Sequence, residues 1–131
     1  MTAKSQYDPR LVLGLRWLAR LWAAALLLFW GAFFVEHTTE WFVHPHDWPP
    51  MEVALLHAAH FLLLLGLLVG CRWELLGGIV ALAAAILFFP QVSEKNAVVF
   101  LMLSVGPAAL WIGLGGYAIG RRSSTASPTV G

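Results

Sequence analysis

Four long apolar runs make up most of this sequence, and they restrict what the chain can fold into more than any other feature. The runs cover residues 17–35, 51–71, 75–89 and 97–119. As a helix at ~1.5 Å per residue, the first run measures about 28 Å, close to the ~30 Å hydrocarbon thickness of a bilayer. Because short connections separate the runs, they predict an all-α fold: an integral membrane four-helix bundle with up-down-up-down order.

The composition agrees with burial in lipid. Of the 131 residues, 60% are hydrophobic and 11% are charged, and the mean hydropathy of +0.76 is too apolar for a soluble domain with a polar surface. The length predicts a single transmembrane domain over residues 1–122 and a disordered polar tail at 123–131. The first run is not followed by a small-x-small cleavage site, so we expect it to be retained as a helix.

Prolines and polar residues mark the connections between the runs. The segment His-Pro-His-Asp-Trp-Pro-Pro at 44–50 breaks the helix, and Pro50 suits the first turn of the next one. Residues 72–74 form a very short turn, in which Arg72 is expected to pair with Glu74 or with lipid headgroups. Pro90 is expected to end the third helix, and Gly106-Pro107 to kink the fourth.

Basic residues set the expected orientation. Seven of the eight Lys and Arg residues lie before residue 21, in the 72–74 turn or after residue 120, and Lys95 is the exception. With four crossings these three regions share one side of the membrane, and the positive-inside rule places that side in the cytoplasm. We therefore expect both termini inside and residues 36–52 at the outer face.

The stretch from Val35 to Phe61 concentrates the groups that could carry chemistry. It holds all five histidines and four of the seven acidic residues, but no Lys or Arg. Glu36 and Glu40 are four residues apart, and His57 and His60 are three apart, so each pair shares a helix face. If the first two helices are antiparallel neighbours, the glutamate pair and the histidine pair lie at a similar depth in the membrane. Such a set, Glu36, Glu40, His57 and His60, is a candidate site for zinc, copper or iron.

Other interpretations of this stretch stay open. Histidines within lipid are also satisfied by hydrogen bonds between helices, which is the more ordinary use. One imidazole could hold a haem- or chlorophyll-type pigment axially. The segment His44-Pro-His-Asp could bind copper or zinc, or be a solvated connection. Ionisable groups in a membrane also suggest proton or metal-ion transport, although the third and fourth runs carry none in their interiors.

Small residues point to close contacts between helices. Gly66 and Gly70 form a small-xxx-small pair, and Gly116 and Gly120 form another. We expect both pairs to pack closely, within the chain or against another subunit.

No catalytic set is recognisable in the sequence. There is no nucleophile near a histidine, no phosphate-binding loop and no cofactor fingerprint, so we do not expect an enzyme. The leading hypothesis is a non-catalytic accessory or structural subunit of a larger membrane complex. Its partners would be the lipid bilayer and other membrane subunits or further copies of itself, and not nucleic acid.

Three stretches carry a resemblance to a known family. They are Arg-Trp-Leu-Ala-Arg-Leu at 16–21, the Phe-rich end of the first helix closing in Glu36, and residues 66–78 with the pattern G-x3-G-x-R-W-E-x2-G-G. Over most of residues 10–116 the chain resembles a family of small bacterial four-helix membrane proteins described only as a domain of unknown function. The resemblance implies a multi-pass protein of the bacterial inner membrane, and it implies no activity.

Overall fold

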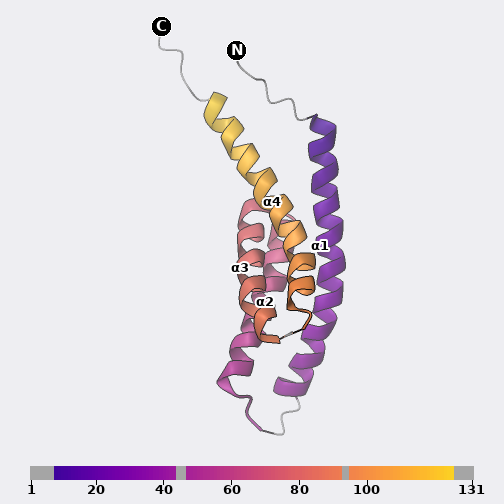
Figure 1. Cartoon of the computed structure of the whole chain (residues 1–131), viewed down its shortest axis with the longest axis vertical. Helices are drawn as coiled ribbons and strands as arrows, with labels where there is room; N and C mark the ends of the chain where they lie inside the picture. The colour runs from indigo at the N-terminus through magenta and orange to yellow at the C-terminus, as the bar shows by residue number, and fades with distance from the viewer. Residues whose placement is uncertain (1–7, 44–46, 93–94, 126–131) are drawn as a thin grey trace.

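The computed structural model describes residues 8–43, 47–92 and 95–125, and all regular structure in this part of the chain is helical. Successive helices alternate in direction, so the start of α1 and the end of α4 lie at one end of the bundle. The end of α1 and the start of α2 lie at the other (Figure 1). The elements in chain order are α1 (Pro9–Thr38), a π-helical turn η1 (Thr39–Val43), α2 (Met51–Gly70), α3 (Glu74–Val92) and α4 (Ala97–Thr125).

All four α-helices of the described residues are long and apolar enough to cross a membrane. The shortest, α3, has 19 residues and measures about 28 Å at ~1.5 Å per residue, which matches the ~30 Å hydrocarbon core. The predicted all-α fold of four helices is therefore confirmed. Helices of this length and composition indicate a multi-pass membrane protein.

Several helix ends lie beyond the predicted spans, and α1, for example, covers Pro9–Thr38 where the first apolar run covers 17–35. Pro90 does not end α3, which continues to Val92. Proline lacks the N–H for one helical hydrogen bond, but its fixed φ of about −65° is itself helical, so a final turn can continue through it. The fourth helix continues to Thr125, within the predicted tail; residues 126–131 of that tail lie outside the described part of the chain.

The closest helix contact joins α2 to α3 through glycines. A Cβ atom on Gly66 would lie 2.8 Å from the Cα atom of Ala81, and one on Gly77 would overlap the backbone nitrogen of Gly70. All four residues are buried. Because no side chain separates the helices at these points, their backbones meet directly, as small-residue contacts in membranes allow.

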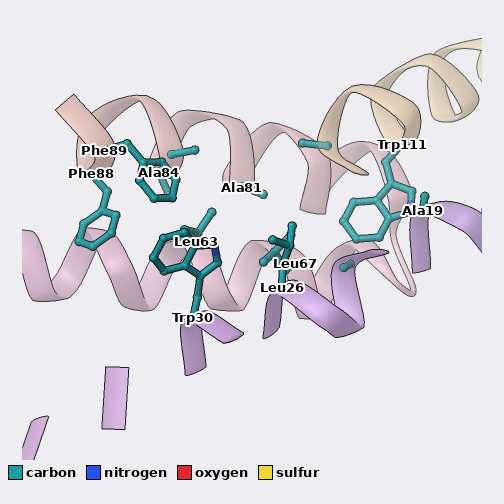
Figure 2. Packing of buried hydrophobic residues seen from close by; sticks show 13 residues of the cluster. Ala19, Leu26, Trp30, Leu63, Leu67, Ala81, Ala84, Phe88, Phe89 and Trp111 are labelled. Carbon is teal, nitrogen blue, oxygen red and sulfur yellow. The ribbon is translucent and has the colours of Figure 1, made fainter. Parts of the chain in front are cut away.

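Tryptophan rings from α4 and α1 fill the space beside two glycines, Gly70 and Gly106. The ring of Trp111 in α4 lies where a Cβ atom of Gly70 would be, and the ring of Trp22 in α1 does the same at Gly106. Gly106 thus has a packing role against Trp22, and the kink expected at Gly106-Pro107 stays a prediction. Figure 2 shows Trp111 at one end of the buried cluster, with Phe88 and Phe89 at the other.

Helix α1 lies beside α2 and α4 and reaches α3 through long side chains. Its buried residues form one stripe, Ala19, Ala23, Leu26 and Trp30. The Trp30 ring packs on Phe89 of α3, with ring centroids 5.0 Å apart. At the opposite end, the Arg16 Nε atom lies 3.0 Å from a Glu74 carboxylate oxygen. Glu74 therefore pairs with Arg16, and not with Arg72 as the sequence suggested.

We expect Gly77→Ala to lower the free energy of unfolding by about 1–3 kcal/mol, because the new methyl group overlaps the α2 backbone. Titration of the micelle-bound protein with sodium dodecyl sulfate measures this. The matched control is Gly14→Ala, since a Cβ atom on this exposed glycine of α1 meets nothing within 4 Å. Alanine favours a helix over glycine by up to ~1 kcal/mol, so the control should be neutral or stabilising. Equal losses in both variants would contradict the α2–α3 contact.

Candidate functional site

A cavity of about 490 Å³ opens at the end of the bundle where α1 meets the start of α2. We call it the histidine cavity. Residues of α1, η1, α2, α3 and α4 line it. Its aromatic walls are Phe29, Trp30, Phe33, Trp41, Phe88, Phe89 and Phe100, and its polar groups are His37, His57, His60 and Gln91.

A hydrogen bond between His57 and Thr38 ties α2 to α1 beside this cavity. The Thr38 hydroxyl donates to the Phe34 carbonyl at 2.7 Å and lies 3.0 Å from His57 Nε2. A hydroxyl has one hydrogen, which Phe34 already receives, so the His57 ring must donate through Nε2–H. In the neutral ring, Nδ1 then carries the lone pair.

Aromatic rings hold the His57 imidazole on two sides. The Phe34 ring stacks on it at 4.3 Å and 17°, and the Phe42 ring lies 5.0 Å away. Phe42 belongs to η1, which follows Thr38 directly and has Thr39 as its first residue. Both hydroxyls donate to the carbonyl four residues back and so compete with the α-helical hydrogen bonds, which favours a change of helix type at this point.

His60 is the most buried of the three cavity histidines, with 4% of its surface exposed. Rings from two other helices surround it: Phe88 at 4.6 Å, Phe34 at 5.3 Å and Trp30 at 6.2 Å between centroids. Its Nε2 atom is buried and has no hydrogen-bond partner among the described residues. A polar atom in such a position costs free energy unless something bonds to it.

Trp30 fixes the wall of the cavity to α4. Its Nε1–H donates to the Ser104 hydroxyl at 3.2 Å, and both residues are buried. The ring also packs edge-on against Phe100 of α4 at 5.3 Å. The Trp30 side chain therefore contacts α3 and α4 at once, and these contacts fix its position in the bundle.

His37 stands at the rim. Its side chain is exposed, and Nδ1 lies 2.8 Å from the Phe33 carbonyl of its own helix. A carbonyl oxygen accepts only, so Nδ1 carries the hydrogen and Nε2 is the acceptor of the neutral ring.

The structure does not assemble the predicted metal site. Among the described residues no group of three His, Cys, Asp or Glu side chains could hold a metal ion, and Glu36 and Glu40 are exposed. The residue of α1 that meets His57 is Thr38. Glu36 lies two positions earlier, a rotation of about 200° around the helix, and so faces away. His44 and His46 of the predicted loop site lie outside the described residues.

The two predicted glycine pairs differ in what surrounds them. Gly66 and Gly70 are buried against α3 and Trp111. Cβ atoms on Gly116 and Gly120 would meet nothing within 4 Å among the described residues, so an added side chain would have open space at both positions. Their packing against another subunit stays a prediction, as do the pigment and transport hypotheses.

Sequence reasoning missed Thr38, Trp30 and Ser104. The sequence did contain a signal for Trp30 and Thr38. The helical spacing of the α1 stripe continues from Trp30 through Phe34 to Thr38. Nothing in the sequence distinguishes Ser104 as the partner of Trp30.

We expect Thr38→Val to lower the free energy of unfolding by about 1 kcal/mol, because it removes the hydrogen bond between helices and keeps the shape of the side chain. The control is Thr39→Val, whose hydroxyl donates to the Val35 carbonyl four residues back and not to another helix among the described residues. Detergent titration of both variants measures the difference. A loss in Thr39→Val as large as that in Thr38→Val would count against the Thr38–His57 bond.

Comparison with known proteins identifies a family of uncharacterised proteins. The model of a protein family described as a domain of unknown function (DUF7670) matches residues 8–116, which include all the described residues of the histidine cavity. No curated protein and no solved structure matches the chain.

Proposed function

This chain belongs to the DUF7670 family, and from its own structure we propose that it is a non-catalytic integral membrane protein, a small accessory subunit of a larger membrane assembly. The family description assigns no activity. The proposal therefore stands on which surfaces the bundle leaves available to a partner.

One face of α4 carries the proposal. Ala109, Gly113 and Gly116 share a stripe at helical spacing, and all three are exposed. Cβ atoms on the two glycines would meet nothing within 4 Å, whereas Gly66 and Gly70 use the same small size for contacts inside the bundle. Glycine disfavours a helix by up to ~1 kcal/mol relative to alanine. A second helix packed closely on this stripe would offset that cost.

Short connections support the same proposal. Three residues, 71–73, join α2 to α3, and among the described residues between the helices η1 is the only regular structure. In the part of the chain that the structure describes, contacts with a partner are therefore made mainly by helix faces.

The proposed location is the inner membrane of a bacterium, with both termini in the cytoplasm and the histidine cavity toward the outer face. The support is the distribution of basic residues: of the seven in the described part of the chain, six lie toward one end of the bundle, and Lys95 lies at the other.

Cysteine labelling tests this orientation. In a Cys71→Ser background, Asp47→Cys should react with a membrane-impermeant maleimide in intact cells. Ser123→Cys should react only after the inner membrane is opened, because it lies at the other end of the bundle. If both variants react from the same side, the four-crossing arrangement is wrong.

Purification from native membranes in a mild detergent tests the subunit role. We expect a stoichiometric partner or a second copy to purify with the tagged chain, and Gly116→Leu to reduce its yield at least several-fold because a leucine prevents close approach. The control is Gly14→Leu, the same change at another exposed glycine with nothing within 4 Å of its Cβ position. A wild-type chain that purifies alone as a monomer would refute the proposal.

A further inference from the structure

The histidine cavity has the size and lining of a small-molecule site. Its volume of about 490 Å³ lies within the ~300–1,000 Å³ of typical ligand pockets. Seven of its described lining residues are aromatic. Flat rings present their faces and edges to another flat ring, so these walls favour a planar ligand.

The charge of the lining restricts the ligand further. Among the described residues that line the cavity there is no Asp, Glu, Lys or Arg. A charged ligand would lose its hydration without gaining an opposite charge, which is costly in an apolar site. The described lining therefore suits an uncharged ligand better than a charged one.

His60 supplies the specific contact. It is 4% exposed, it lines the cavity, and its Nε2 atom lacks a hydrogen-bond partner among the described residues. A neutral imidazole nitrogen either donates to a carbonyl oxygen or accepts from a hydroxyl group. His57 differs, because its Nε2–H is already engaged with Thr38.

We propose that the histidine cavity binds an uncharged, membrane-soluble ring compound that bears a carbonyl or hydroxyl oxygen, the chemistry of a benzoquinone or its hydroquinone, with that oxygen hydrogen-bonded to His60 Nε2. The inference concerns a site separate from the α4 stripe, so it does not depend on the subunit role.

The cavity is accessible to such a compound from the lipid. Two lining residues of α1, Phe29 and Phe33, are 50% and 40% exposed. They lie on a helix that would cross the membrane, so the cavity reaches the surface of the bundle that faces acyl chains. A ring with an apolar tail can therefore enter sideways from the bilayer.

Saturable binding to nanodiscs tests the proposal. The probe is a tritium-labelled benzoquinone with one prenyl tail, added to nanodiscs that hold the full chain and to empty nanodiscs. We expect saturable binding to the protein-loaded discs only. His60→Phe should weaken binding about fivefold by removing the hydrogen bond, and His60→Gln should restore much of it.

A second pair of variants separates occupancy of the cavity from effects on folding. Val53→Trp places a larger side chain into the lining and should abolish saturable binding. Val98→Trp, the same change at an exposed residue of α4 outside the lining, should leave it unchanged. Circular dichroism checks that both variants remain helical.

Three results would overturn the proposal. One is uptake by loaded discs no greater than by empty ones. Another is saturable binding that neither His60→Phe nor Val53→Trp alters, which would place the site elsewhere. The third is a Soret band in the wild-type protein purified from native membranes that is lost in His60→Phe, which would make the occupant a tetrapyrrole.

Discussion

The direct backbone contact between α2 and α3 is the constraint on which the rest of this structure depends. Gly66, Gly70 and Gly77 bring these two helices so close that no side chain fits between them at these points. In lipid there is little hydrophobic force between helices, so such close van der Waals contact is the main source of their association. The tight pair then provides the surface on which Trp111 of α4 is seated, and α4 in turn receives Trp22 and Trp30 of α1.

The sequence predicted the number and type of helices well, and it predicted their faces poorly. Backbone groups in a membrane must be satisfied within the helix, so long apolar runs are a direct signal for spanning helices. The usual signal for the inner face of a helix is a change from apolar to polar residues, and lipid removes it because the outer face is apolar too. In α2, for example, Leu63 is fully buried and Leu68 is 61% exposed.

The same reasoning explains the partial success at the site. The sequence singled out the end of the bundle that holds the histidine cavity. It also singled out His57 and His60, two of the histidines that line this cavity, because ionisable groups stand out in an apolar chain. It then chose the carboxylates of Glu36 and Glu40 as their partners. The contacts to His57 are made instead by the hydroxyl of Thr38 and the ring of Phe34. Burying either of these groups in lipid costs less free energy than burying a carboxylate. Pairing by charge alone thus pointed to the wrong face of α1.

The hydrogen bond from Trp30 to Ser104 joins residues that are 74 positions apart. Translation proceeds from the N-terminus, so α1 leaves the ribosome well before its partner residues in α4 have been made. The α2–α3 hairpin, with three residues between its helices, needs no such delay. The contacts that Trp22 and Trp30 make with α4 can therefore form only after the last helix has been synthesised.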